Sequence, residues 1–241
     1  MKINSKTDIG KARHSNQDAY FAGELENGAV FVIVCDGMGG ANAGNIASTT
    51  AVKLISEYIL RSYRLSMDEF EIEKMLSNAI KSANLEVFEA ANSDSELKGM
   101  GTTVVIALIQ NSKAVIAHVG DSRIYLLGDD IKQLTKDHSV VQSLIESGKI
   151  SADEAKSHPR KNVITRALGA EENIIVDTSE LNVTDGQTLL LCTDGLTSMV
   201  EADRILSLYK EKSAEELVSS LIDEANLNGG IDNITVVTLK V

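Results

Sequence analysis

The stretch VFVIVCDGMGG, residues 30–40, decides the fold of this chain. Its first six residues are β-branched, aromatic or otherwise apolar, which is typical of a strand buried on both faces. The apolar run ends at Asp36, and a buried carboxylate is costly unless it is paired or binds a metal ion. The glycines at 37, 39 and 40 allow a sharp turn and a close approach of the backbone to a ligand. The stretch therefore predicts a buried strand that presents an acid to a binding site.

Other apolar segments carry an acid at one end in the same way. One leads to Asp121 and another to Asp194, whereas Asp232 precedes the predicted strand at 234–239. A single acid at the end of a strand is an ordinary loop residue. Its recurrence on several strands suggests carboxylates that converge on a cation.

Composition and charge restrict the classes of function. The chain has 241 residues, 43% of them hydrophobic, and no linker divides it, so we expect one domain spanning residues 1–241. The net charge of −12 argues against nucleic-acid partners and anionic membranes, which favour basic surfaces. Cys35 and Cys192 lie in apolar strands and are expected to be buried thiols. Without an apolar signal region or a segment of transmembrane length, we expect a cytoplasmic protein with no membrane insertion.

The order of predicted strands indicates antiparallel sheets rather than regular β-α-β alternation. In addition to the segments above, strands are expected at 2–8, 19–23, 102–109, 114–119, 123–127, 174–180 and 188–192. Short turns between neighbouring strands imply antiparallel pairing. Strands that are apolar on both faces imply two packed sheets covered on the outside by helix pairs. The predicted fold is therefore an α+β sandwich of four layers, α-β-β-α.

Helical periodicity predicts two long helices after the glycines. The first begins at Asn42 or its neighbours, and the second buries apolar residues between 72 and 87. Sequence patterns typical of capping boxes occur at Ser66 with Glu69 and at Ser213 with Glu216. A further helix is expected at 139–148, with His138 in a capping position, and residues 149–162 are expected to form a polar, mobile excursion.

The acids of the chain suit a hard cation. The set Asp18, Asp36, Asp121, Asp194 and Asp232 offers the oxygen ligands that Mg²⁺ and Mn²⁺ prefer, and neither zinc spacing nor an EF-hand loop occurs. Several carboxylates around two cations suggest a two-metal site with a bridging water made nucleophilic. Arg13 lies close to Asp18 in the sequence and offers a fork of N–H donors for a phosphate. The alternative for Arg13 is an ion pair with Asp18.

Eight ordered motifs resemble those of the metal-dependent protein phosphatases, the PPM or type 2C family. They are RHSNQD at 13–18, DGMGG at 36–40, GTT at 101–103, GDSR at 120–123, LTKDHS at 134–139, RALG at 166–169, TDGL at 193–196 and DNIT at 232–235. Each motif alone is weak, but eight in the family's order across nearly the whole chain are specific. The compact length is similar to that of bacterial members, which typically oppose a eukaryotic-type serine/threonine kinase.

The resemblance implies a β-sandwich with metal ions in a channel at one end. Asp36 would bridge two ions of Mn²⁺ or Mg²⁺. Asp194 and Asp232 would hold the first ion, and the carbonyl of Gly37 would hold the second, largely through water. Asp121 with Asp194 would hold a third, weaker ion.

The resemblance also implies roles for residues that are not metal ligands. Arg13 would bind the substrate phosphate, and Asp18 would act from behind the metal ligands. Residues 144–165 would form a flap beside the site. Met38 stands where eukaryotic members have a histidine that is proposed to protonate the leaving oxygen. Methionine has no proton to donate, so a metal-bound water is the best candidate for the acid.

The prediction is a Mn²⁺- or Mg²⁺-dependent phosphoserine/phosphothreonine protein phosphatase. A metal-bridging hydroxide would attack phosphorus in line without a phosphoenzyme. Expected partners are phosphorylated proteins and a cognate Ser/Thr kinase, and the chain is expected to be a monomer. One alternative is a non-catalytic module of the same fold that binds phosphoproteins or metal, against which the intact Asp36, Asp194 and Asp232 argue. The other is a two-metal phosphodiesterase, against which the acidic balance and the 4% aromatic content argue.

Overall fold

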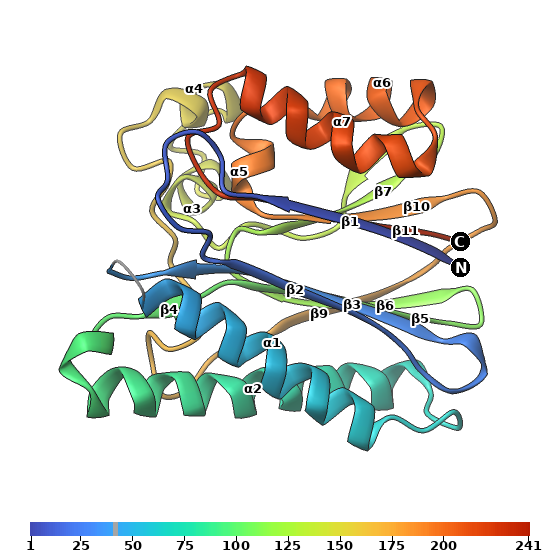
Figure 1. Cartoon of the computed structure of the whole chain (residues 1–241), viewed down its shortest axis with the longest axis horizontal. Helices are drawn as coiled ribbons and strands as arrows, with labels where there is room; N and C mark the ends of the chain where they lie inside the picture. Colours follow the sequence, from blue (N-terminus) through green and yellow to red (C-terminus); the bar gives the residue numbers. More distant parts are fainter. Residues whose placement is uncertain (41–42) are drawn as a thin grey trace.

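Two antiparallel sheets pack face to face, with helices on both outer sides (Figure 1). The computed structural model describes residues 1–40 and 43–241, so the start of the first helix, predicted near Asn42, lies outside the described residues. The first sheet has the order β1 (Lys2–Asp8), β11 (Ile234–Lys240), β10 (Thr188–Cys192), β7 (Arg123–Leu127), β8 (Ile131–Gln133). The second has the order β2 (Asp18–Glu24), β3 (Val30–Met38), β5 (Val104–Gln110), β6 (Lys113–Val119), β9 (Asp177–Asn182), and β4 (Gly101–Thr102) pairs with β3.

Successive side chains of β3 point to opposite faces of the sheet and so belong to two different apolar cores. Val30, Val32 and Val34 face the first sheet, where they join an apolar cluster that includes Leu191 and Val237. The intervening residues of β3, among them Phe31 and Ile33, face outward and pack under α1 (Ala43–Ser62) and α2 (Glu69–Ser93). Because both faces of this strand are buried, the predicted four-layer α-β-β-α sandwich is confirmed.

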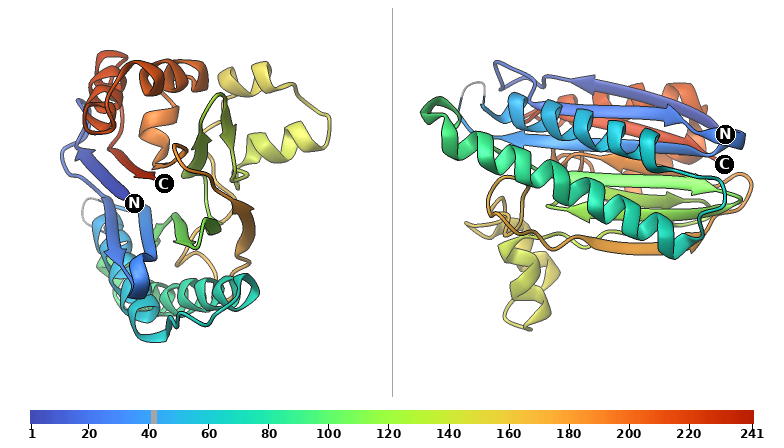
Figure 2. Two further views of the ribbon diagram at one scale, coloured as in Figure 1. Left: turned by 90° about the vertical axis from the view of Figure 1, so that its right-hand side faces the viewer. Right: turned by 90° about the horizontal axis from the view of Figure 1, so that it is seen from below.

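The other outer face is covered by helices from the C-terminal third of the chain. A separate apolar cluster joins the first sheet to α5 (Asp194–Thr197), α6 (Ala202–Glu211) and α7 (Ala214–Leu227). Two short helices, α3 (Val140–Glu146) and α4 (Ala152–Ser157), stand out to one side of the sandwich (Figure 2). None of the helices that the structure describes is long and apolar enough to cross a lipid bilayer.

Several boundaries differ from the sequence prediction. The capping box of α2 is formed by Asp68 and Glu71, so the prediction at Ser66 was wrong by two residues, whereas the box at Ser213 of α7 is confirmed. Residues 149–162, predicted as a polar excursion, contain α4 with its own capping box. His138 does not cap α3, because the side chain of Ser139 accepts the hydrogen bond from the helix backbone.

The ends of the acid-bearing strands lie at one end of the sandwich. The C-terminal end of β3 pairs with the start of β2, and the C-terminal end of β10 pairs with the starts of β7 and β11. This is the end at which α3, α4 and α5 lie, and the two chain termini lie at the other end (Figure 1). Strand pairing therefore brings together acids from five separate parts of the chain.

Candidate metal centre

Pairing between β2 and β3 sets two of the predicted acids opposite each other. Asp18 and Asp36 are register partners, and both side chains belong to the strand faces that look toward the first sheet. Strand β3 continues past Asp36 to Met38 and pairs there with β4, so Asp36 lies within the strand rather than at its end. Its backbone is held by Thr103, which donates its N–H to the carbonyl of Asp36 at 2.9 Å and accepts the N–H of Asp36 at 3.0 Å.

The electrostatics of Asp36 show that the acids converge. Burial raises the pKa of its carboxyl group well above the ordinary value, and neighbouring carboxylates raise it further; these belong to Asp18, Asp194, Asp121 and Asp232. Burial, followed by the charge of Asp232, also raises the pKa of Asp194. Like charges in a buried site disfavour ionisation, so the cluster is unfavourable as bare carboxylates and favourable around cations.

Unpartnered oxygens provide a direct test of whether a cation fits. The Oδ1 atoms of Asp18 and Asp194 are buried and have no hydrogen-bond partner in the part of the chain that the structure describes. A buried carboxylate oxygen without a donor costs free energy, which an oxygen-binding cation would recover. The all-oxygen donor set fits Mn²⁺ or Mg²⁺.

The other oxygen of Asp18 is fixed by two threonines, Thr193 directly after β10 and Thr235 in β11. Thr193 and Thr235 donate their hydroxyl protons to Asp18 Oδ2 at 2.9 and 2.7 Å. Burial raises the pKa of Asp18 to about 7, even though these two hydrogen bonds lower it. Sequence reasoning quoted both threonines only as members of motifs and assigned them no role.

Two glycines allow the backbone to close tightly around the acids. A Cβ atom on Gly37 would lie 2.0 Å from the carbonyl oxygen of Gly44, and one on Gly195 would lie 1.9 Å from that of Asn233. Both distances are far below any real contact, so no side chain fits at either position. Each glycine follows an acid directly, Asp36 in one case and Asp194 in the other.

Arg13 reaches the acids through Asp232. Its Nη2 lies 2.8 Å from Asp232 Oδ2 and donates a hydrogen bond to it, and this carboxylate is the main cause of the raised pKa of the guanidinium. The ion pair with Asp18 that the sequence left open as an alternative is therefore not the one that forms. Half of the Arg13 side chain remains exposed to solvent.

Asn233 joins the segments that carry Arg13 and Asp232. Its side-chain oxygen accepts the N–H of Gln17 at 2.8 Å, and its amide group donates to the carbonyls of Ile9 and Ser15, both at 2.9 Å. The residue thus ties the loop before β2 to the start of β11. Sequence reasoning quoted Asn233 only as part of a motif, because its partners lie more than 200 residues away along the chain.

A cleft of 440 Å³ opens beside the acids. Asp121 and Asp194 line one part of it, and the segment 144–165, which we call the flap, lines another with Ile145, Ala155 and Lys156. Burial raises the pKa of Asp121 to about 7, followed by the charge of Asp194. The cleft therefore connects the acid cluster to the flap.

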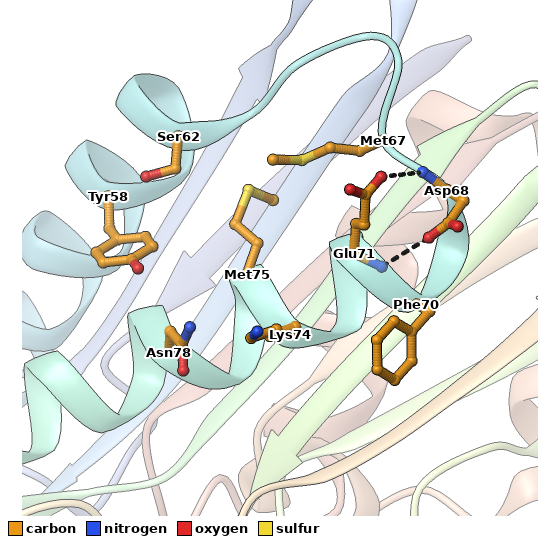
Figure 3. A pocket seen from close by; sticks show the side chains of 9 residues that line it. All are labelled: Tyr58, Ser62, Met67, Asp68, Phe70, Glu71, Lys74, Met75 and Asn78. Atoms are coloured by element: carbon orange, nitrogen blue, oxygen red, sulfur yellow. Dashed lines mark hydrogen bonds between the residues drawn. The ribbon is translucent and has the colours of Figure 1, made fainter.

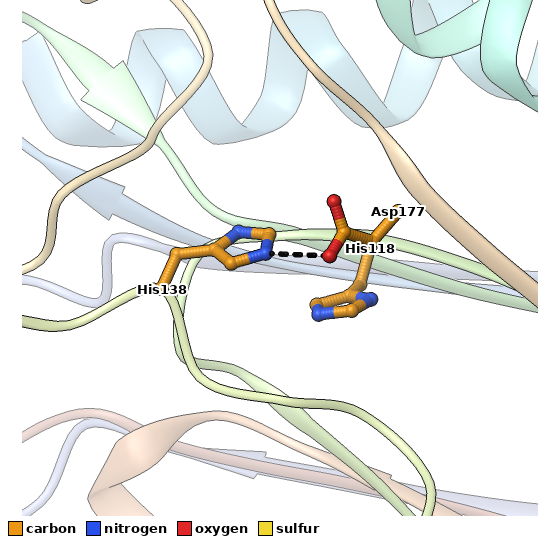
Figure 4. A group of neighbouring side chains, drawn as sticks. All are labelled: His118, His138 and Asp177. Atoms are coloured by element: carbon orange, nitrogen blue, oxygen red, sulfur yellow. Dashed lines mark ion pairs between the residues drawn. The ribbon is translucent and has the colours of Figure 1, made fainter. Parts of the chain in front are cut away.

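A second group of potential metal ligands lies near the base of the flap (Figure 4). The rings of His118 and His138 stack with centroids 4.7 Å apart, and His138 Nε2 lies 3.3 Å from Asp177 Oδ2. His138 Nδ1 accepts the N–H of Gly120 at 3.0 Å, so neutral His138 carries its proton on Nε2. A metal ion would need that nitrogen deprotonated while Nδ1 keeps its hydrogen bond. The geometry therefore favours a structural cluster.

Another pocket lies away from the acids. It has a volume of 570 Å³ and lies between α1 and α2, where Tyr58, Met67, Phe70 and Met75 contribute to its lining (Figure 3). The hydrogen bonds drawn there belong to the capping box of α2. It contains none of the predicted site acids, so we assign the chemistry to the cleft beside Asp121 and Asp194.

Comparisons with known proteins show which proteins this chain resembles. The sequence model described as Protein phosphatase 2C matches residues 11–227. The serine/threonine phosphatase stp of Listeria innocua is 44% identical over 242 positions, covering 100% of this chain and 96% of the relative. The solved S. agalactiae serine/threonine phosphatase has a TM-score of 0.94 at 36% identity, covering 100% of this chain and 99% of that chain. The catalytic domain of the serine/threonine protein phosphatase PstP, in complex with two manganese ions, has a TM-score of 0.85 at 29% identity, covering 98% and 96%.

Proposed function

Because the chain belongs to the protein phosphatase 2C family of metal-dependent serine/threonine protein phosphatases, we propose that its acid cluster is the metal centre of such an enzyme. Asp36 would bridge two ions of Mn²⁺ or Mg²⁺, with Asp194 and Asp232 on the first and the carbonyl of Gly37 facing the second. Asp121 would join Asp194 around a third, weaker ion. The observation that carries this proposal is the buried, unpartnered Oδ1 of Asp194 in a cluster with Asp36, whose carboxyl pKa is raised by burial and then by the neighbouring acids.

The bound ions would act as Lewis acids toward the phosphoryl group and the attacking water. Asp18 would position the metal ligands without binding an ion directly. The hydroxyls of Thr193 and Thr235 fix its Oδ2, and its Oδ1 is buried without a partner in the described residues. This arrangement holds the ligands in place before substrate arrives, which lowers the reorganisation that the reaction needs.

Arg13 would orient the substrate phosphate. A guanidinium has five N–H donors, so the ion pair with Asp232 leaves donors for phosphate oxygens. About half of its side chain is exposed to solvent, so it is accessible to a phosphorylated side chain. Met38 has no proton to give, so the leaving oxygen would take its proton from water.

The cellular setting is inferred as well. We propose a single-domain, cytoplasmic monomer that acts on phosphorylated proteins and opposes a Ser/Thr kinase. The free, buried thiols of Cys35 and Cys192 support a reducing compartment. The net charge of −12 supports protein substrates over nucleic acid.

The test is manganese-dependent release of phosphate from a phosphothreonine peptide by the purified protein, compared with hydrolysis of a nucleotide diester. We expect phosphate release from the peptide, its loss on chelation and its return with Mn²⁺. Metal-dependent hydrolysis of the diester alone would replace the proposal with a phosphodiesterase. Peptide binding without turnover would favour the non-catalytic module.

A further inference from the structure

The flap brings positive charge to the cleft of an acidic protein. Between residues 149 and 162 there are four lysines and arginines and two acids, whereas the whole chain carries a net charge of −12. Two of these cations, Lys156 at the end of α4 and Lys161 in the following loop, line the cleft together with Asp121 and Asp194. The sequence alone favours an ordinary solvated loop here. The structure adds that Lys156 and Lys161 line the cleft.

Lys156 already binds a carboxylate in this cleft. Its Nζ lies 3.2 Å from Oε1 and 3.3 Å from Oε2 of Glu201, which precedes α6 and also lines the cleft. Both side chains are mainly exposed, 60% for Lys156 and 76% for Glu201. Exposed ion pairs of this kind contribute little free energy, so a competing anion can replace Glu201. Lys161 forms no ion pair with any residue in the described ranges 1–40 and 43–241.

We propose that Lys156 binds an anionic group of the substrate next to the phosphorylated residue, and that Glu201 occupies this position in the free enzyme. The anion is a carboxylate or a second phosphate, since both offer oxygen acceptors to an ammonium group. The inference rests on the proposed function, because the phosphate to be removed must lie at the acid cluster for a neighbouring residue to reach the flap.

The position of Lys156 makes it a determinant of specificity rather than of the chemical step. Neighbouring acids of the cleft would repel an anionic side chain unless it faced the flap, so the two lysines also set the direction in which the substrate lies. Lys161 adds a second cation on the same wall and would strengthen the preference for a doubly charged phosphate.

The experiment compares kcat/KM for three phosphothreonine peptides that differ in the adjacent residues: alanine, glutamate or phosphoserine. It uses the full chain, the variants Lys156→Gln and Glu201→Gln, and the control Lys149→Gln. Lys149 is an exposed flap lysine that does not line the cleft. Because Lys156→Gln and Glu201→Gln remove the same ion pair, a purely structural role for that pair would shift both in the same direction.

We expect the parent to favour the glutamate peptide over the alanine peptide by about threefold, as a solvent-exposed charge pair allows. Lys156→Gln should bring the ratio close to one, Glu201→Gln should raise it, and Lys149→Gln should keep the parent ratio. A larger preference for the phosphoserine peptide, lost in Lys156→Gln, would identify the second phosphate as the better ligand. A preference for glutamate of equal size or larger would identify the carboxylate.

Two results would overturn the inference while the proposed function stands: equal ratios in the parent and Lys156→Gln, or shifts in the same direction in Lys156→Gln and Glu201→Gln. The absence of manganese-dependent hydrolysis of any of the three peptides would overturn the proposed function together with the inference. The two failures are therefore distinguishable in one set of measurements.

Discussion

Asp18 and Asp36 face each other across the β2–β3 ladder, although like charges at directly opposed positions destabilise a sheet. The protein tolerates the pair because each carboxylate has its own support. Hydroxyl groups of Thr193 and Thr235 hold Asp18, and the site around Asp36 suits a cation. This division of roles underlies the first of the following predictions.

Replacing Asp36 with asparagine should separate activity from stability. Asp36→Asn removes a charged ligand from the centre of the cluster, so phosphopeptide turnover should fall by at least about 10²–10³-fold. The thermal midpoint of the metal-free protein should hold or rise, because repulsion among buried carboxylates decreases. Asp130→Asn, at an exposed turn, is the matched control and should change neither quantity. Near-normal turnover by folded Asp36→Asn would refute the two-metal assignment.

Arg13 should act mainly on substrate binding. Arg13→Ala removes charge-assisted hydrogen bonds to the phosphate and should raise KM for phosphopeptides about 10-fold, with a smaller loss in kcat. Steady-state kinetics at saturating manganese measure both parameters. If KM and kcat both keep their parent values, Arg13 serves only as the partner of Asp232.

Asp121 should matter for the proton that the leaving group receives. Asp121→Ala should leave the thermal midpoint nearly unchanged, because a weakly populated cation site contributes little to stability. If this carboxylate helps to hold the water that protonates the leaving oxygen, the variant should lose more activity on a phosphopeptide than on an activated aryl phosphate, whose leaving group needs no proton. The ratio of the two activities across manganese concentration is the measurement. Equal losses would remove the proton-delivery role and leave the metal role intact.

The stability of the metal-free protein should decrease as pH rises from about 4 to 8. Burial raises the pKa of Asp18 and of Asp121 to about 7, so their favourable contribution is complete below the ordinary aspartate pKa and is lost as pH rises through 7. Manganese binds the ionised carboxylates. The rise in thermal midpoint that manganese causes should therefore be larger at pH 8 than at pH 5.

The measurement is the thermal midpoint with manganese and with chelator across this range. Burial lowers the pKa of His138, so this residue has the opposite effect on stability: its contribution is lost as pH falls below 6.5. Because His138 titrates in both conditions, the difference between the two curves isolates the acids. A manganese-induced shift of equal size at every pH would contradict the prediction.

The sequence predicted the layers of the fold because periodicity records burial. The continuous apolar run at 30–35 was sufficient to place this strand between two cores. Helix boundaries were less secure, since Ser66 with Glu69 and Asp68 with Glu71 satisfy the same capping pattern two residues apart. Only tertiary packing decides which of two such overlapping patterns forms the cap of the helix.

The site residues also divide into those that the sequence predicts and those that only the folded structure reveals. The acids that sequence reasoning grouped do lie together, and their roles as ligands stay predictions. Thr193, Thr235 and Asn233 were missed as supporting residues, because a threonine in a strand is also an ordinary β-former and an asparagine near a turn is an ordinary loop residue. Their importance comes from partners in distant segments, which a single sequence does not reveal.

The ladder between β1 and β11 joins the first and last strands of the chain, and β11 lies inside its sheet between β1 and β10. Asp232 and Asn233 immediately precede this strand, so the acid cluster cannot be assembled until β11 itself has been synthesised and has paired. Before that point the position of β11 would be open, with an unpaired strand edge on β1 and another on β10. A chain that stops short of β11 would therefore be both inactive and prone to aggregate.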